Sequence, residues 1–349
     1  MNRQKFSIIP ALVLLMAQAA TLNAATHPVA NSAQLSAALS TFASGDVIQL
    51  TANITHNTRI NISGKIVTIN LNGFSLTVDC SDEYGLRVRN KGELRLTGAS
   101  ASAKFNVKGR GGVNAESGGK AAVSNATGTH DNGVNASDAG TEVVVWEKAS
   151  AEIAGAGVVA DFGAAVRVSD AEGHSYGVYA NGAGSKVIAG ETKSTGDSTH
   201  NYGAYGGDGA EVTVYGNATV SNSIGNGRYG VWATGAGTKV TVGGNVTSTG
   251  NRNTYGAHAS NGAELTVSGN ISASAGTSFS AVGVFAAGAG TKVTVGGNVT
   301  STGDINSGAA DTDGVQAYAG AEVSVAGDVT GSFCGVRAVD AGSKVTVDG

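Results

Sequence analysis

Short runs in which apolar and polar residues alternate, separated by glycine-rich joints, follow one another along most of this chain. The run Gly288–Gly303 (GAGTKVTVGGNVTSTG) occurs letter for letter at Gly235–Gly250, and a diverged copy occupies Gly182–Gly196, so the copies begin 53 residues apart. Related but different phrases begin at Gly207 and Ser260, midway between these copies, so the structural unit is about half of the 53 residues. Units of this length, with Val-x-Val alternation and glycine joints, are typical of the coils of a β-solenoid. The pattern therefore predicts an all-β fold.

Each predicted coil carries a short phrase of the form x-G-V-x-A, and we call its glycine the reference glycine of that coil. The eleven reference glycines lie 20 to 31 residues apart, at Gly85, Gly112, Gly133, Gly157, Gly177, Gly203, Gly230, Gly256, Gly283, Gly314 and Gly335. With about 4.8 Å between neighbouring parallel strands, such a stack of coils forms a rod about 50 Å long.

Three strands are expected in each coil. In the coil of Gly256 they cover residues 255–259, 263–267 and 270–274. Because side chains alternate between the two faces of a strand, the inward positions of the second and third strands hold Leu265, Val267, Ile271 and Ala273. One further row precedes the third strand and is expected to adopt a left-handed turn and to stack its amides from coil to coil: Asn217, Asn245, Asn270 and Asn298, with Asp328 in the next coil.

The segment before the first repeated coil has a different pattern. Leu35, Ala38, Leu39 and Phe42 fall on one face of a predicted helix, which Gly45 ends. Strand-like runs follow over residues 46–50, 60–62, 66–71 and 74–78. A short amphipathic helix at this point would cover the open end of a solenoid, where strand edges and core are otherwise exposed.

Residues 1–25 have the features of a secretory signal peptide. Arg3 and Lys5 precede a short apolar run, and Asn23-Ala24-Ala25 offers small residues for cleavage. The alternative is a retained interfacial anchor. We therefore expect three parts: a signal peptide over 1–25, a cap with the first β-helix strands over 26–80, and a repetitive β-helix over 81–349.

Composition is compatible with export and argues against a nucleic-acid partner. Charged residues make up 14% of the chain and the net charge is −4, so no basic surface for nucleic acid is expected. Cys80 and Cys334 fall at opposite ends of the predicted rod, farther apart than the 7 Å or so that a disulfide allows between Cα atoms. Their role stays open, with burial as small apolar residues the simplest explanation.

A charged row tests the register of the predicted stack. The residue before the first apolar position of the second strand reads, coil by coil, Glu93, Lys120, Glu142, Ala165, Lys186, Glu211, Lys239, Glu264, Lys292, Glu322 and Lys344. No two like charges are neighbours, and a slip by one coil would place lysine on lysine. We interpret the row as a structural charge ladder; an ion-binding strip is the alternative.

A second outward row lies two residues after the reference glycine. It reads Tyr179, Tyr205, Trp232, His258 and Phe285. Flat rings on a face of otherwise small residues can stack on sugar rings or on the apolar surface of a partner. The row is therefore a candidate binding surface, and an aromatic ladder that only stiffens the rod is the alternative.

Hydroxyl residues form a third outward row on the third strand. The pairs are Thr219 with Ser221, Thr247 with Thr249, Ser272 with Ser274, Thr300 with Thr302, and Thr330 with Ser332. Such ranks resemble those of ice-binding solenoids, but threonine is also simply a good strand residue on a solvated face.

Two stretches carry a resemblance to known families. The run LSAALSTFASGDVIQLTANI (Leu35 to Ile54), followed by VTINLNGFSLTV, resembles right-handed parallel β-helix proteins of the pectate-lyase-like kind. The later coils resemble passenger segments of bacterial autotransporter adhesins. The resemblance implies a right-handed single-stranded parallel β-helix of about eleven coils with an N-terminal helical cap. It also implies export to the cell surface, the outer membrane or the extracellular space.

A catalytic constellation is not evident. Pectin-hydrolase relatives carry Asn-Thr-Asp, Asp-Asp, Gly-His-Gly and Arg-Ile-Lys motifs; here only Gly173-His174-Ser175 comes close, and the chain has no Asp-Asp pair. His174 and His200 occupy equivalent positions in adjacent coils and could hold a metal with Glu172 or Asp197, but solvated turn histidines are the simpler interpretation. We expect neither enzymatic activity nor a cofactor or metal.

The last coil ends at Gly349, before its third strand. We therefore expect a longer parent protein, and a downstream outer-membrane barrel would fit the resemblance. The predicted function is an exported adhesin or structural stalk that contacts a glycan or protein on a host or neighbouring cell through many weak contacts. The alternatives are a polysaccharide lyase or hydrolase of the same fold and an ice-binding solenoid.

Overall fold

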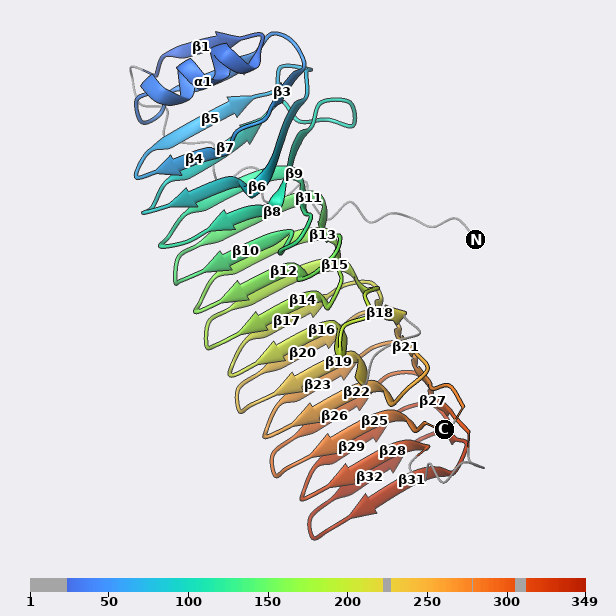
Figure 1. Cartoon of the computed structure of the whole chain (residues 1–349). Coiled ribbons are helices and arrows are strands. Elements are labelled where there is room, and N and C mark those ends of the chain that lie inside the picture. Colours follow the sequence, from blue (N-terminus) through green and yellow to red (C-terminus); the bar gives the residue numbers. More distant parts are fainter. Residues whose placement is uncertain (1–23, 222–226, 278, 305–311) are drawn as a thin grey trace.

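The chain winds into a parallel β-solenoid, shaped as a rod with a helix at its N-terminal end (Figure 1). The computed structural model describes residues 24–221, 227–277, 279–304 and 312–349. The residue after each reference glycine stands beside its equivalent in the next coil, from Leu86 through Val113 and Val134 up to Val336. The predicted all-β solenoid of about eleven coils and the alignment of its coils are confirmed.

Three parallel stacks of strands form the walls of the rod. The stack that carries the reference glycines holds β4 (Ile60–Ser63), the second halves of β6 (Leu76–Arg89) and β8 (Phe105–Ala115), β10 (Val134–Ser137), β12 (Ala156–Asp161), β14 (Tyr176–Asn181), β16 (His200–Gly207), β19 (Gly227–Thr234), β22 (Thr254–Ser260), β25 (Ala281–Ala287), β28 (Asp313–Tyr318) and β31 (Cys334–Val339). The second stack holds β1 (Thr26–Val29), β2 (Val47–Leu50), β5 (Ile66–Asn70), β7 (Glu93–Thr97), the first halves of β9 (Lys120–Gly128), β11 (Glu142–Ala151), β13 (Ala165–Gly173) and β15 (Lys186–Ser194), then β17 (Glu211–Val214), β20 (Lys239–Val242), β23 (Glu264–Val267), β26 (Lys292–Val295), β29 (Glu322–Val325) and β32 (Lys344–Val347). The third stack holds β3 (Ile54–His56), the first halves of β6 and β8, the second halves of β9, β11, β13 and β15, then β18 (Ala218–Ser221), β21 (Val246–Thr249), β24 (Ile271–Ser274), β27 (Val299–Thr302) and β30 (Val329–Gly331).

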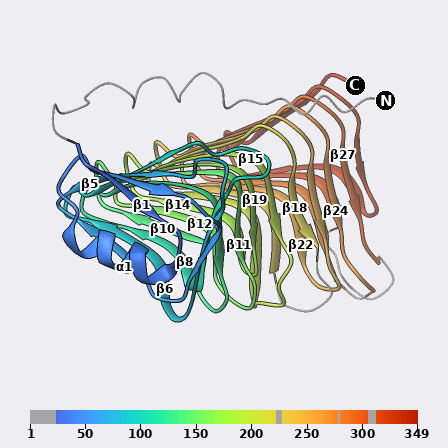
Figure 2. The same cartoon turned by 90° about the horizontal axis from the view of Figure 1, so that it is seen from above.

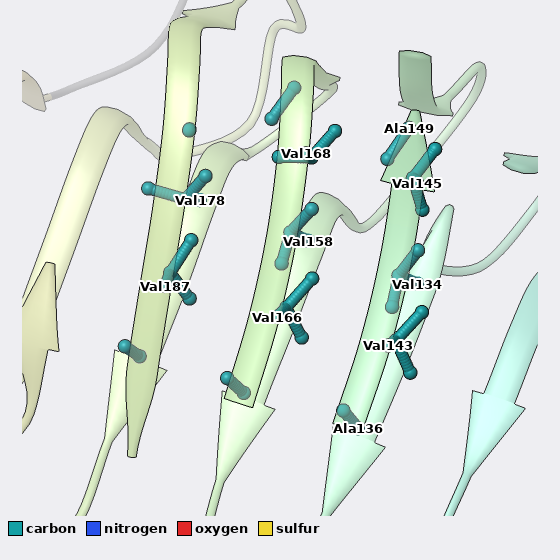
Figure 3. Packing of buried hydrophobic residues seen from close by; sticks show 14 of the residues in the cluster. Val134, Ala136, Val143, Val145, Ala149, Val158, Val166, Val168, Val178 and Val187 are labelled. Carbon is teal, nitrogen blue, oxygen red and sulfur yellow. The ribbon is translucent and has the colours of Figure 1, made fainter. Parts of the chain in front are cut away.

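The core is a column of small and branched apolar side chains along the axis of the rod. In Figure 3, Val134, Val158 and Val178 of the first stack lie near Val143 and Val166 of the second, and all five are buried. Residues of one kind repeat at equivalent positions, so each coil fills its cross-section in the same way as its neighbours. Stability therefore comes from contacts between adjacent coils, as in other repeat proteins.

The reference glycine is required because the third strand approaches it closely. A Cβ atom on Gly256 would lie 2.3 Å from Cγ2 of Ile271, and one on Gly283 would lie 2.4 Å from Cγ1 of Val299. Both contacts are shorter than real Cβ atoms tolerate. The glycine thus lets the first inward residue of the third strand fill the core.

Helix α1 (Ser32–Thr41) covers the N-terminal end of the stack, as predicted, and Figure 2 shows it lying across the first coils. Asn31 caps the helix by accepting a hydrogen bond from the Gln34 amide at 3.0 Å. Leu35 and Ala38 of its inner face are buried. Strands β1 and β3, which the sequence pattern did not predict, complete the coils beneath the cap. Among the described residues, no helix has the length and apolar character needed to cross a membrane.

A histidine joins the cap to the first coil. His56 on β3 is buried, and its two ring nitrogens lie 2.8 Å from the hydroxyls of Ser32 and Thr58. Burial lowers the pKa of His56. The predicted signal peptide lies almost entirely on residues 1–23, outside the described residues.

The turn between the first and second strands explains why the amino-acid sequence repeats every second coil and not every coil. In every second coil from that of Thr141 onward, the hydroxyl residue before the second strand bridges two turns. The Thr238 hydroxyl, for example, donates to the Thr234 carbonyl at 2.7 Å and accepts from the Gly209 amide of the previous coil at 2.8 Å. Thr291 and Ser185 make the same pair of bonds in their coils. In the intervening coils alanine stands at this position, at Ala210, Ala263 and Ala321. Two kinds of coil therefore alternate, and one coil of each kind together makes up the 53-residue repeat.

The row of asparagines does not adopt the left-handed turn that the sequence suggested. None of Asn217, Asn245, Asn270 and Asn298 is among the described residues with a positive φ. Each of the four accepts, through its side-chain oxygen, a hydrogen bond from the backbone amide of the equivalent residue in the next coil, at 2.8 to 3.0 Å. The side chains thus act as an additional column of inter-coil hydrogen bonds. Left-handed residues lie instead in the turns, for example at Asn261.

The two cysteines are free and partly buried. Cys80 lies on β6 and Cys334 on β31, in coils near opposite ends of the rod (Figure 1).

Candidate binding surface

The predicted aromatic row is a continuous column on the outside of the first stack. Tyr179, Tyr205, Trp232, His258 and Phe285 are register partners in successive coils, on β14, β16, β19, β22 and β25. The ring centroids of Tyr179 and Tyr205 lie 4.8 Å apart with planes 4° apart, and those of His258 and Phe285 lie 4.7 Å apart with planes 17° apart. We call this column the outer aromatic row.

A second column of rings, which the sequence reasoning missed, runs beside it. Tyr176, Tyr202, Tyr229 and Tyr255 immediately precede the reference glycines of four successive coils and are register partners. Their rings stack at centroid distances of 4.6, 5.1 and 5.0 Å with planes 4° to 10° apart. We call this column the tyrosine row.

The tyrosine row was missed because strict alternation fails at the reference glycine. A Cβ atom added to Gly177 would point at the Lys193 backbone of the same coil, and the following Val178 is fully buried. Two consecutive residues therefore face inward. The residue before the glycine therefore shares the outer face with the residue two positions after it. Reading the column of residues before the glycines would have shown four consecutive tyrosines.

The two rows pack against each other edge to face and together form what we call the aromatic strip. Tyr176 meets Tyr179 at a centroid distance of 5.2 Å with planes 78° apart, and Tyr229 meets His258 at 5.7 Å and 87°. Stacked and perpendicular contacts are the two arrangements that aromatic quadrupoles favour, at about 0.5–1.5 kcal/mol per pair. The contacts of Trp232 with Tyr229 and His258 are tilted instead, at 46° and 43°. The strip is therefore a rigid, preformed surface.

Mutual packing of the rings shields several of their polar groups from water. Burial raises the pKa of Tyr179 and of Tyr229 to about 12 and lowers the pKa of His258 to about 4. The Trp232 indole nitrogen and the His258 Nδ1 are buried without a hydrogen-bond partner among the described residues. The strip thus presents mostly apolar ring surface to its surroundings.

A hollow lies at each end of the strip. Both rows end at the first hollow, and the tyrosine row ends at the second. The hollow at the N-terminal end has a volume of about 230 Å³ and is lined by Asn132, Gly155, Ala156, Val159, Ser175, Tyr176 and Tyr179. The hollow at the C-terminal end has a volume of about 300 Å³ and is lined by Asn253, Tyr255, Ser280, Val282, Phe285, Gln316 and Tyr318. We refer to them as the N-terminal hollow and the C-terminal hollow.

The charged row stacks in the register that its alternation predicts. Each member stands beside the next as a parallel register partner, through Glu93, Lys120, Glu142, Ala165, Lys186, Glu211, Lys239, Glu264, Lys292, Glu322 and Lys344. Ion pairs of 3.0, 2.8 and 3.3 Å join Lys120 to Glu142, Lys186 to Glu211 and Lys239 to Glu264. These side chains are largely exposed, so each pair contributes at most about 1 kcal/mol.

The hydroxyl ranks of the third strand also lie in register. Thr219, Thr247, Ser272, Thr300 and Thr330 form one column, and Ser221, Thr249, Ser274 and Thr302 form the next. The second strands carry a further outward column that the sequence reasoning did not use: Thr213, Thr241, Thr266, Thr294, Ser324 and Thr346. It runs two residues away from the charged row on the same face.

The two histidines considered as metal ligands make separate contacts. His174 pairs with Asp197 at 3.1 Å, and the His200 ring lies over Tyr229 with centroids 6.5 Å apart. Glu172 pairs with Lys148 at 2.5 Å, and this contact lowers the pKa of Glu172. In the described part of the chain, no group of three or more histidine, cysteine or acidic side chains is placed to hold a metal ion.

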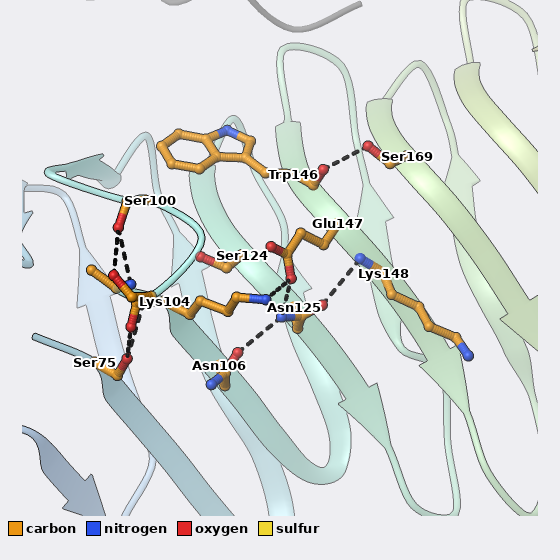
Figure 4. A network of polar contacts seen from close by, with 12 residues as sticks. Ser75, Ser100, Lys104, Asn106, Ser124, Asn125, Trp146, Glu147, Lys148 and Ser169 are labelled. Carbon is orange, nitrogen blue, oxygen red and sulfur yellow. Dashed lines mark hydrogen bonds and ion pairs between the residues drawn. The ribbon is translucent and has the colours of Figure 1, made fainter. Parts of the chain in front are cut away.

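A polar network surrounds an irregularity in β11, where the register shifts between Val145 and Lys148 (Figure 4). Glu147 accepts from Lys104 Nζ at 2.8 Å and from Asn125 Nδ2 at 2.9 Å. The Asn125 amide also donates to Asn106 at 2.9 Å. At the shift itself, the Lys148 backbone amide donates to Asn125 Oδ1 at 3.2 Å, and the Trp146 carbonyl accepts from the Ser169 hydroxyl at 2.6 Å. Side chains thus bond backbone groups at the irregularity, so the network has a structural role.

Comparison of the chain with family models, with curated proteins and with solved structures finds no match in any of the three. The fold and the surface geometry therefore carry the functional argument, and the identity that they establish is that of a parallel β-solenoid of about eleven coils.

Proposed function

We propose that this protein is an exported rod that acts at a cell surface as an adhesin or stalk, in the manner of an autotransporter passenger. The segment with signal-peptide features supports export, and the repeated coils resemble such passengers. The right-handed coil of pectate-lyase-like proteins is part of the same proposal. The partner is a glycan or protein on a host or neighbouring cell.

The observation that carries the proposal is the aromatic strip. Two rows of rings run side by side over four successive coils, from β14 to β22, and the outer row continues onto β25. A row of like groups at a spacing of about 4.8 Å offers a repeating partner several weak contacts at once. Contacts of this kind add by avidity when the partner is itself a repeating surface.

Rigidity supports the same proposal. The rings hold one another in place, so a partner does not have to order them when it binds. The interlocked charge ladder and the turn hydroxyls keep the coils in a single register. A binding face built on such a rod keeps its spacing over its whole length.

The test is binding of the purified protein to a glycan array and to intact cells, with the variants Tyr205→Ala and Trp232→Ala. Tyr215→Ala is the matched control, because Tyr215 is 50% exposed and lies outside the strip. Loss of one central ring should weaken binding roughly tenfold, as expected for an aromatic contact worth more than about 1 kcal/mol. Unchanged binding by both strip variants would reject the aromatic strip as the binding surface.

A further inference from the structure

The N-terminal cap contains a carboxylate that is shielded from water. Asp46 stands in the turn between α1 and β2 and is only 4% exposed. Its Oδ2 accepts a hydrogen bond from the Ala43 amide at 2.8 Å and lies 2.8 Å from Nε2 of His27. Hydrogen bonds from His27, Ala43 and Ala25 lower the pKa of Asp46 to about 2, so the group is a carboxylate at neutral pH.

A shielded carboxylate normally has a cation beside it, because an isolated charge is costly to remove from water. Asp313, the other buried carboxylate among the described residues, has Arg337 at 3.8 Å. The ion-pair partner of Asp46 is His27, which carries a charge only when it is protonated. Within the described part of the chain, Asp46 therefore has no partner with a permanent charge.

The second oxygen of this carboxylate bonds the start of β1, which lies with α1 at the N-terminal end of the rod (Figure 1). Oδ1 of Asp46 accepts a hydrogen bond from the backbone nitrogen of Ala25 at 3.0 Å. The Ala25 carbonyl accepts from the Val47 amide at 2.8 Å, and this bond holds Ala25 against β2. Ala25 is itself exposed. A charged group at the Ala25 nitrogen would therefore contact both Asp46 and water.

The Ala25 nitrogen is also a place where the signal peptide of an exported chain would be cut. Ala24 and Ala25 are small residues of the kind that flank such a cleavage site. Hydrolysis of the bond between them adds the hydroxyl of water to the Ala24 carbonyl carbon and the hydrogen to the Ala25 nitrogen. The freed amine takes up a proton, because an α-amino group has an ordinary pKa of about 8. A neutral amide donor 3.0 Å from Asp46 thus becomes a cation.

We propose that Asp46 is the binding site for the α-ammonium group of Ala25, which a signal peptidase frees by cutting the chain between Ala24 and Ala25. This cut lies one residue before the end of the signal peptide expected over 1–25, since a cut after Ala25 would remove the donor to Oδ1. The ammonium group supplies the permanent charge, and a charge-assisted hydrogen bond is stronger than a neutral one. The cap is then fully stabilised only in the processed chain. This inference rests on the export part of the proposed function and not on adhesion.

Two chains and two substitutions test the site. A chain of residues 25–349 has its ammonium group at Asp46, whereas a chain of residues 24–349 carries it one residue away, about 3.8 Å along the backbone. Both are made from a fusion whose removal leaves the chosen first residue. Asp46→Asn removes the charge and keeps the size of the side chain. His27→Gln is the matched control, because His27 also contacts Asp46 but its replacement leaves the carboxylate in place.

The reactivity of the amine is the direct readout. Acetic anhydride acetylates a free α-amine, and the mass of the N-terminal tryptic peptide, which ends at Arg59, reports the extent. The pH profile of acetylation should give a pKa about one unit higher for the 25–349 chain than for the 24–349 chain or Asp46→Asn, so that acetylation at pH 7 is roughly tenfold slower. His27→Gln should react as slowly as the 25–349 chain. The same amine pKa with and without the carboxylate would overturn the proposal.

Hydrogen exchange over residues 25–50 measures the cap itself. In the 25–349 chain, Asp46→Asn should lower the protection of the β1 amides at least roughly tenfold, and in the 24–349 chain it should lower it much less. The reason is that only the first chain has an ammonium group for the carboxylate to bind. An equal fall in both chains would show that Asp46 only orders the turn, and the proposal would be wrong.

The mass of the exported protein keeps this site and the proposed function apart. Protein collected outside cells that express the full chain should have the mass of residues 25–349, and a different first residue overturns the cut between Ala24 and Ala25. If the chain stays uncut inside the cells, export and the cut both fail, while acetylation of the 25–349 chain still decides whether Asp46 binds an ammonium group. If the protein is exported and cut as expected but does not adhere, only the adhesin function fails.

Discussion

His258 makes the stability of the aromatic strip depend on pH, and His258→Phe should remove that dependence. The imidazole lies between Trp232 and Phe285, at centroid distances of 4.5 and 4.7 Å, and its Nδ1 is buried without a partner among the described residues. Burial lowers its pKa from 6.5 to about 4. Phenylalanine has a similar shape and would continue the outer aromatic row without a group that titrates.

The sign follows from where the proton binds. In the unfolded chain His258 takes up a proton below about pH 6.5, whereas in the folded chain it stays neutral down to about pH 4. Between these values the unfolded state binds more protons, so the free energy of unfolding falls as the pH is lowered. One pKa unit corresponds to about 1.4 kcal/mol, so the loss over the whole window is about 3 kcal/mol. Above pH 6.5 the term is constant.

Urea unfolding followed by tryptophan fluorescence at pH 4, 5, 6 and 7 measures the effect. The difference in free energy of unfolding between the unaltered protein and His258→Phe should shift by about 3 kcal/mol in favour of the variant between pH 7 and pH 4. His56, whose pKa burial also lowers, is present in both proteins and cancels. His130→Gln, at an exposed histidine outside the strip, is the control substitution. Parallel pH profiles for His258→Phe and the unaltered protein would refute the burial argument.

Three further substitutions test the packing rules of the rod. Gly256→Ala should lower the free energy of unfolding by about 1–3 kcal/mol in urea titrations, because its Cβ would lie 2.3 Å from a core methyl group; no change would show that the third strand can move away. Thr238→Ala should cost about 1–3 kcal/mol by leaving the turn amide of the previous coil unbonded, whereas Thr238→Ser should be nearly neutral; equal losses would point to the methyl group instead. Lys239→Glu forms a column of three carboxylates with Glu211 and Glu264 and should lower the melting temperature at low salt. The melting temperature should recover at 1 M salt, where repulsion between charges more than about 3 Å apart is screened. A loss that does not depend on salt would contradict the charge ladder.

The sequence allowed the coil boundaries and the charged and outer aromatic columns to be predicted, because each depends on a residue type that recurs at one position. The reference glycines recur because bulkier residues would collide with the third strand, and Lys239 alternates with Glu264 because like charges repel at one strand spacing. What escaped prediction depends on backbone detail. Two inward residues in succession move Tyr202 to the outer face, and no alternation rule shows that shift.

The N-terminal strands show a second limit. Strand β1 is a four-residue run containing Pro28 and pairs with β2. So short a run has no repeat to identify it, and its place follows from the cap that α1 forms above it. The asparagine row was predicted from the turn preference of the residue type, whereas its actual role depends on an amide in the next coil, which a local preference does not describe.

The alternation of two kinds of turn has a consequence for how such a rod changes length. The segments Gly235–Gly250 and Gly288–Gly303 are identical in sequence and stand 53 residues apart, so unequal recombination between the corresponding stretches of the gene would add or remove a pair of coils. A pair of coils brings one turn with a hydroxyl residue and one turn with alanine, together with one lysine and one glutamate of the charged row. The alternation of both features is therefore kept where the inserted pair meets the coils on either side. Growth by a single coil would set two turns of one kind against each other. Variants of this protein in nature should therefore differ in length by even numbers of coils.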